Sequence, residues 1–245
     1  MATTQPTDAT TQPTAATTQS TDHSKAGITL GIALAGILLG IGSLWYLFAE
    51  AIAAAGFPGY SYANNFISDL GVPELGVVLE GHHLDSQLAI VMNAGFLGQA
   101  LAVTLAGVLL WWSLPAGRGR NLTLVFAIVH SFGIALVGLV HGSPANDAAG
   151  FMVYHGLGAG MAIAGGNALA ILAGRTTLRS LLGPTLSRVS IWLGVCGLLS
   201  AVVHFVSKQN GVVDGLGISE RGAVYSIMIW QLIVAALVLR AHRVR

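Results

Sequence analysis

Residues 60–71 read YSYANNFISDLG and form the most polar stretch within an otherwise apolar part of the chain. Asn65 and Asp69 are four residues apart, so both lie on one face if the stretch is helical. Gly71 stands where a helix typically ends. The sequence therefore predicts a short amphipathic helix at a membrane surface, with its polar face turned towards the rest of the protein.

Apolar segments lie on both sides of this stretch. About 20 apolar residues in a helix cross the hydrocarbon core of a bilayer, and a helix satisfies its own backbone hydrogen bonds, as lipid requires. Six segments are near this length: residues 28–49, 87–112, 122–140, 151–173, 186–206 and 223–239. The sequence predicts an all-α integral membrane protein, a six-transmembrane helix bundle with the helix at 60–71 on its outer surface between the first two spans.

The composition supports the same class. Hydrophobic residues make up 54% of the chain and charged residues 9%, whereas a soluble domain has about 25% charged residues. The lipid bilayer is therefore the expected partner, and the net charge of +1 argues against nucleic acid. The single cysteine, Cys196, excludes an internal disulfide and cysteine-only metal motifs.

Residues 1–25 form a separate region of low complexity. The units ATTQPTD, ATTQPTA and ATTQSTD follow one another without a large apolar residue, which excludes a coiled coil. Thr, Gln, Pro and Ala bury too little apolar surface to offset the entropy of the chain. We expect a disordered cytoplasmic tail over residues 1–25, followed by the transmembrane domain over residues 26–245.

Lys and Arg residues predict the orientation, because short cytoplasmic loops are enriched in them. The loops over residues 50–86 and 141–150 contain neither residue. Basic residues follow the second, fourth and sixth spans: Arg118, Arg120, Arg175, Arg179, Arg240, Arg243 and Arg245. We expect a multi-pass protein of the cell membrane with both termini in the cytoplasm and residues 60–71 outside.

Polar and ionisable side chains gather at the predicted outer ends of the spans. Such side chains are costly in lipid and usually face an interior cavity. Ser43 and Glu50, for example, are seven residues apart and share one face of the first span. The sequence predicts an outward-facing polar pocket whose candidate residues are Asn65, Ser68, Asp69, His141, His155, His204, Glu220 and Arg221.

A metal site is a weaker prediction in the loop after the first span. His82, His83 and Asp85 carry side chains that bind zinc. Their spacing matches no established ligand motif, so the sequence leaves both metal and cofactor open.

Three stretches carry a family resemblance: NNFISDLG at 64–71, HGSPANDAAGFMVYHGLGAGMAIAGGNALAIL at 141–172 and GISERGAVYSIMIW at 217–230. They resemble the signatures of the polytopic membrane-protein family called domain of unknown function 998, mostly bacterial and archaeal, and the resemblance covers residues 26–245. It implies a helical membrane fold and no particular activity. The positions that match by this resemblance are Asn65, Ser68, Asp69, His155, Asn167, Glu220 and Arg221, and Asn167 thereby joins the candidates above.

Several functions remain open. We favour a non-catalytic scaffold or regulator in which polar residues hold the helices together and Asp69 pairs with Arg221. One alternative is an intramembrane enzyme acting on a lipid or lipid-linked substrate. Ser68 would then be a nucleophile with a histidine base, or histidines with Asp69 would bind a metal that activates water.

Two binding functions complete the alternatives. The outer polar residues suit a transporter or a protein that binds a small molecule at the outer face. A b-type haem held by His130 together with His204 or His155 is also compatible with the histidine positions.

Overall fold

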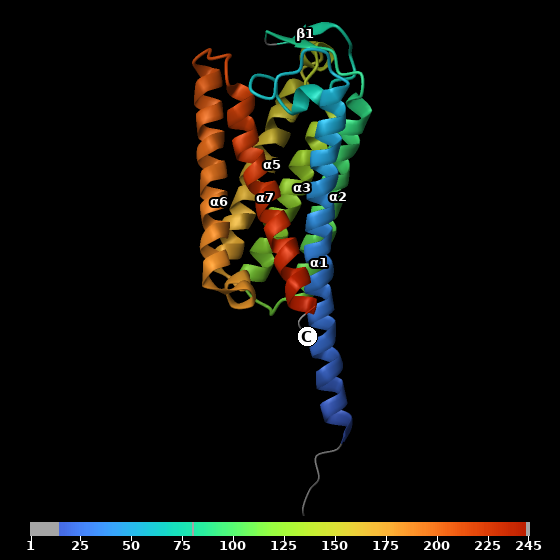
Figure 1. Cartoon of the computed structure of the whole chain (residues 1–245), viewed down its shortest axis with the longest axis vertical. Helices are drawn as coiled ribbons and strands as arrows, with labels where there is room; N and C mark the ends of the chain where they lie inside the picture. Colours follow the sequence, from blue (N-terminus) through green and yellow to red (C-terminus); the bar gives the residue numbers. More distant parts are fainter. Residues whose placement is uncertain (1–14, 80, 244–245) are drawn as a thin grey trace, which may run out of the picture.

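The computed structural model describes residues 15–79 and 81–243 (Figure 1). In that part of the chain, six helices are long and apolar enough to cross a membrane. They are α1 (Ala15–Ala55), α2 (Ala89–Ser113), α3 (Arg118–Leu139), α5 (Met152–Arg175), α6 (Thr177–Gln209) and α7 (Leu216–Arg243). The prediction of an all-α membrane protein with six spans is therefore confirmed.

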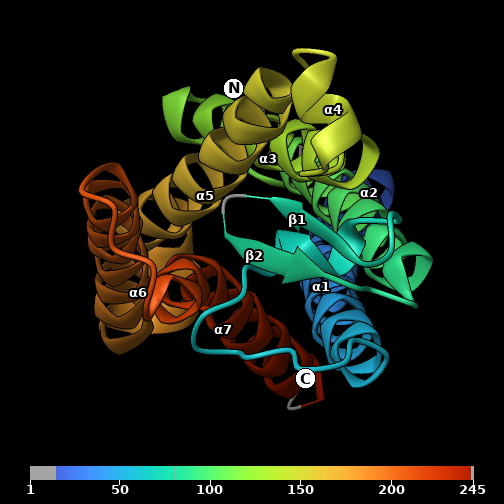
Figure 2. The ribbon, with the colours of Figure 1, turned by 90° about the horizontal axis from the view of Figure 1, so that it is seen from above.

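The spans form a ring in which each helix packs against its neighbours (Figure 2). The order around the ring is α1, α2, α3, α5, α6 and α7, and α7 closes it against α1. In α6, the span begins at Gly183, whose φ of 79° interrupts the helix before Pro184. This span is the most peripheral, with 17% of its most apolar part buried against 44–50% in the other spans described.

The start of α1 and the end of α7 lie at the same end of the bundle (Figure 1). Residues 1–14 of the predicted tail lie outside the described residues, but residues 15–25, which we expected to be disordered, belong to α1. Helix α1 can begin this early because neither proline nor glycine occurs between Pro13 and Gly27 to end the helix.

Residues 60–71, all of them described, do not form the predicted amphipathic helix. They pass through turns and end in the short 3₁₀ helix η1 (Ser68–Gly71). Asn65 and Asp69 do meet, since Asn65 Nδ2 donates a hydrogen bond to Asp69 Oδ2 at 3.3 Å. The same carboxylate oxygen accepts from the backbone N–H of Phe66 at 2.9 Å. Asn, Ser and Asp side chains bond to nearby backbone and so compete with helix formation.

A two-stranded antiparallel hairpin follows η1, formed by β1 (Val77–Leu79) and β2 (His82–Leu84). We call the described part of residues 56–88 the outer cap; it covers the end of the ring away from the start of α1 (Figures 1 and 2). Asn93 of α2 donates to the carbonyl of Gly71 at 2.8 Å, which holds the cap against this helix. The short helix α4 (Pro144–Ala148) lies at the same end, in the loop between α3 and α5.

Glycines bring α1 close to α7. A Cβ placed at Gly40 would lie 2.7 Å from the Cβ of Ala235, and one at Gly36 would lie 3.0 Å from the Cβ of Val238. The close approach that the Gly36 and Gly40 spacing permits is thus present. The matching pair on α5, Gly156 and Gly160, faces open space among the described residues.

A cluster of three polar side chains joins α1, α2 and α7 inside the ring. Gln231 Oε1 on α7 accepts hydrogen bonds from Ser43 Oγ on α1 at 2.6 Å and from Gln99 Nε2 on α2 at 2.7 Å. All three side chains are fully buried. Interhelical hydrogen bonds in a membrane contribute about 0.6 kcal/mol each on average, so this cluster fixes how α1, α2 and α7 face one another.

Candidate functional site

Arg221, near the start of α7, fastens the outer cap to the bundle. Its side chain is buried, with 6% of the residue exposed. Nη1 donates to the backbone carbonyls of Tyr62 at 2.8 Å and Asn65 at 2.9 Å. Nε donates to Glu50 Oε1 at 3.1 Å, and Nη2 lies 3.1 Å from the same oxygen. Because a guanidinium carries five N–H donors, one side chain joins α1, α7 and the cap.

The predicted ion pair between Asp69 and Arg221 is wrong. Arg221 pairs with Glu50, which lies on the helix packed directly against α7. Asp69 Oδ2 instead lies 2.9 Å from His82 Nδ1. The carboxylate of Asp69 is already turned towards its own loop, where it accepts the backbone N–H of Phe66. Asp69 therefore orders the inside of the cap, and Arg221 holds the cap to the helices.

Two tyrosine hydroxyls complete the network around Arg221. Tyr60 donates to the carbonyl of Phe66 at 3.0 Å and accepts from Arg221 Nη2. Tyr225 donates to Glu50 Oε1 at 2.9 Å. Burial raises the pKa of the Tyr60 phenol, so this hydroxyl keeps its proton and remains a donor.

The weak metal candidates are separated by the hairpin. His82 and His83 are consecutive residues of β2, so their side chains point to opposite faces. His82 is buried and pairs with Asp69, whereas His83 is exposed. Among the described residues, no three His, Cys, Asp or Glu side chains are grouped in a way that could hold a metal ion. The structure therefore does not bring His82, His83 and Asp85 together as ligands.

A cavity of about 50 Å³ lies directly beneath the cap. Ile67 and Ser68 of the cap close it, and the remaining lining comes from the spans. These residues are Tyr46 of α1, Phe96 of α2, His130, Ile134 and Val137 of α3, Ala159, Ala162 and Ile163 of α5, and Glu220, Val224, Ile227 and Met228 of α7. The lining is thus mainly apolar, with the polar groups of Ser68, His130, Glu220 and Tyr46 among it.

Glu220 connects the cavity to the cap. Its Oε2 accepts a short hydrogen bond of 2.6 Å from the backbone N–H of Ile67. Among the described residues, no Lys, Arg or His side chain forms an ion pair with this carboxylate. The next residue, Arg221, is directed to Glu50 and to the cap carbonyls instead. The second oxygen of Glu220 consequently remains able to accept a hydrogen bond.

His130 lies in the cavity wall with one ring nitrogen unused. The residue is 1% exposed, and its Nδ1 lies 2.7 Å from the carbonyl oxygen of Ala162. Because a carbonyl only accepts, Nδ1 carries the proton and Nε2 is left as an acceptor. Nε2 is buried and has no hydrogen-bond partner among the described residues. Buried polar atoms without partners are rare in native proteins.

Of the predicted pocket residues, Ser68 and Glu220 line this cavity. Asn65, Asp69 and Arg221 hold the cap, as described above. The rest bond elsewhere: Asn167 Nδ2 donates to a carbonyl of α7 at 3.0 Å, and His155 Nδ1 lies 2.7 Å from a carbonyl after α3. His204 Nδ1 lies 3.1 Å from Ser219 Oγ, and His141 is placed at the end of α3.

Sequence reasoning missed Glu50, Tyr60 and Tyr225 as partners of Arg221 and His130 as a cavity residue. One signal existed for Glu50, which shares a face of α1 with Ser43. Both side chains meet α7, at Arg221 and Gln231. The sequence around His130 did not predict a cavity residue, because a single histidine in an apolar segment is usually a core residue.

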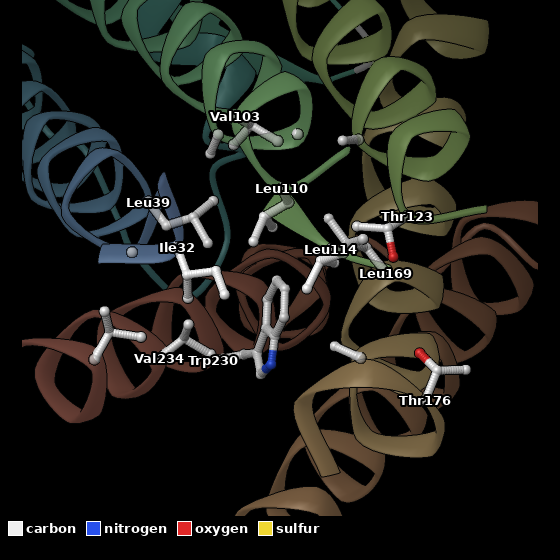
Figure 3. Close-up of a pocket in the computed structure, with 16 residues that line it drawn as sticks. Ile32, Leu39, Val103, Leu110, Leu114, Thr123, Leu169, Thr176, Trp230 and Val234 are labelled. Carbon is white, nitrogen blue, oxygen red and sulfur yellow. The ribbon is translucent and has the colours of Figure 1, made fainter. Parts of the chain in front are cut away.

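A second hollow of about 30 Å³ lies in the half of the bundle away from the cap (Figure 3). Ile32, Leu39 and Trp230 are among the side chains around it. The hydroxyl of Thr123 donates to a carbonyl of α3, and that of Thr176, which follows α5, donates to a carbonyl of α5. This hollow is therefore apolar and offers no free polar group to a ligand, in contrast to the cavity beneath the cap.

Comparison with known proteins identifies a family and nothing closer. A family model described as "Protein of unknown function (DUF998)" matches residues 40–237, which include the cap and all the cavity residues. No curated protein and no solved structure matches the chain. Because the matched region covers most of the sequence, the chain belongs to the family described as protein of unknown function DUF998.

Proposed function

We propose that this protein is a non-catalytic membrane protein that binds a small polar ligand beneath its outer cap. The cavity next to His130 and Glu220 carries this proposal. Leaving a buried acceptor without a partner costs about 1–3 kcal/mol, and a bound ligand would supply the missing donor. His130 Nε2 is such an acceptor, and both His130 and Glu220 line the cavity.

The other polar residues support a structural role around this cavity. Arg221, Tyr60 and the Oε1 atom of Glu50 are engaged in joining the cap to the spans. This favours the part of the scaffold hypothesis in which polar residues hold the helices together. The unused acceptors in the cavity favour ligand binding over a scaffold alone.

We further propose that the cap lies outside the cell membrane and that both termini are cytoplasmic. The connection between α2 and α3 and that between α5 and α6 lie at the end of the bundle away from the cap (Figure 1). These connections adjoin Arg118, Arg120 and Arg175. Such a bias towards one side supports a cytoplasmic position for that side.

A thermal-shift screen of the full chain in detergent tests ligand binding. We expect at least one class among short amines, alcohols, amides and carboxylates to raise the melting temperature, and the variant Ala159→Leu, which fills the cavity, to abolish that shift. Leu139→Ala, an exposed position on α3 outside the lining, is the control. If no class stabilises the protein, or if Ala159→Leu responds like the wild type, the proposal fails.

An intramembrane hydrolase is a second candidate, because Ser68 and His130 line the same cavity. His130 Nε2 would be the base and Ser68 Oγ the nucleophile. Ranking this candidate second rests on the absence of a hydrogen bond between them among the described residues. A fluorophosphonate probe that labels Ser68 in the wild type but not in His130→Phe would favour the hydrolase over the binding protein.

A further inference from the structure

We propose that the cavity beneath the cap takes a small cation with N–H donors, namely ammonium or a short primary amine. This inference rests on the proposed function and adds the chemical class of the ligand. It follows from the hydrogen-bonding capacity, the charge and the size of the cavity.

The hydrogen-bonding groups in the cavity are mainly acceptors. His130 offers the lone pair of Nε2, and Glu220 offers its second carboxylate oxygen. The hydroxyls of Ser68 and Tyr46 accept as well as donate. A primary ammonium group has three N–H donors and no acceptor, so it complements these groups. A ligand that only accepts hydrogen bonds would supply no donor to His130 Nε2 or to the second oxygen of Glu220.

The charge of the lining also favours a cation. Among the described residues that line the cavity, Glu220 is the only acidic one, and none is Lys or Arg. Arg221 forms its ion pair with Glu50, and His82 lies against Asp69, so neither basic side chain forms an ion pair with Glu220. A carboxylate in mostly apolar surroundings requires either a compensating cation or a proton.

Size and surroundings restrict the cation. A cavity needs a volume of about 10–15 Å³ to hold one water-sized group. The cavity beneath the cap has a volume of about 50 Å³, so it holds a ligand of only a few non-hydrogen atoms. The rings of Tyr46 and Phe96 pack edge to face at 5.6 Å and both belong to the lining. Aromatic faces attract ammonium groups, which favours an amine over an ion that needs a full shell of oxygen ligands.

Binding of radiolabelled methylammonium to the full chain in detergent tests this inference. We expect saturable binding of about one methylammonium per chain, with ammonium as a competitor. Tetramethylammonium carries the same charge but has no N–H donor, so it should not compete. Equal competition by tetramethylammonium would overturn the inference, as would the absence of saturable binding.

Three variants locate the binding. Glu220→Gln should weaken methylammonium binding about tenfold or more, because the acceptor of the ammonium group loses its negative charge. Ala159→Leu should abolish binding by filling the cavity while keeping every polar group. Glu74→Gln, which alters a cap acid outside the lining, should bind as the wild type does. Wild-type affinity in a folded Ala159→Leu variant would contradict the site, even if Glu220→Gln does not fold.

Different results would contradict the proposed ligand binding in the cavity and the proposed class of ligand. If short alcohols or amides stabilise the wild type but not Ala159→Leu, and methylammonium does not bind, the cavity is a ligand site and only the ligand class is wrong. If no solute of any class acts through the cavity, both the inference and the proposed function are wrong.

Discussion

At the residue scale, the charges of Arg221 and Glu50 are buried and compensate each other. Their side chains are 8% and 2% exposed, respectively. The remaining donors of Arg221 are satisfied by cap carbonyls and by the Tyr60 hydroxyl. Breaking a buried ion pair by removing one partner leaves an uncompensated charge, which costs about 3–5 kcal/mol. The pair is therefore the point at which a single substitution should affect the outer structure most.

We expect Arg221→Gln and Glu50→Gln each to lower the free energy of unfolding by about 3–5 kcal/mol. The double variant should cost much less than the sum, because it leaves no unpaired charge. Unfolding of the four proteins in one detergent measures this coupling. Arg221→Gln combined with Asp69→Asn is the control, and its coupling should be smaller, because Asp69 pairs with His82 and is linked to Arg221 only through Asn65. Coupling between Asp69 and Arg221, without coupling to Glu50, would show that the ion pair is assigned wrongly.

At the element scale, the outer cap shows why the helical spacing of polar residues led to a wrong prediction for residues 60–71. The spacing of Asn65 and Asp69 does correspond to a contact, but in a turn. The carbonyls of Tyr62 and Asn65, which a helix would use internally, accept from Arg221, more than 150 residues away in the chain. A distant guanidinium thus replaces the local hydrogen bonds of a helix, and nothing in residues 60–71 alone reveals its presence.

The cap should loosen when Asp69 is removed. In Asp69→Ala, the backbone N–H of Phe66 and the His82 ring both lose their acceptor. We expect faster amide hydrogen exchange over residues 61–71, with little change in the spans, because local opening depends on local contacts. Asp85→Ala, which removes another cap acid, is the control. Exchange that stays unchanged in Asp69→Ala would mean that Asp69 does not order the cap.

Helix contacts provide a matched pair of glycine substitutions. Gly40→Ala places a Cβ 2.7 Å from that of Ala235, so α1 and α7 must separate, at a cost of about 1–3 kcal/mol. Gly160→Ala meets no described atom within 4 Å and should be neutral or slightly stabilising, because alanine favours a helix. Melting temperatures in detergent compare the two. A larger loss for Gly160→Ala would indicate that Gly160 packs against a second molecule.

At the scale of the whole molecule, apolar length was enough to predict the membrane spans, since a bilayer leaves a long apolar segment few alternatives to a helix. The gathering of Ser68, Asp69, Glu220 and Arg221 at one end was predictable for a related reason, because polar groups avoid lipid. Their pairing was not, since it depends on the rotation and depth of each helix. The rotation and depth of the helices determine that Arg221 pairs with Glu50 and that His130 lines a cavity.

The orientation of the helix bundle in the membrane decides whether the cavity faces outward. In a Cys196→Ala background, Leu75→Cys in the cap and Ala116→Cys between α2 and α3 place one exposed thiol at each end of the bundle. A membrane-impermeant maleimide should label Leu75→Cys in intact cells and Ala116→Cys only after permeabilisation, because the arginines beside Ala116 favour the cytoplasm. The reverse pattern would place the cap inside the cell. The cavity would then receive its ligand from the cytoplasm, while its residues and the methylammonium test would remain the same.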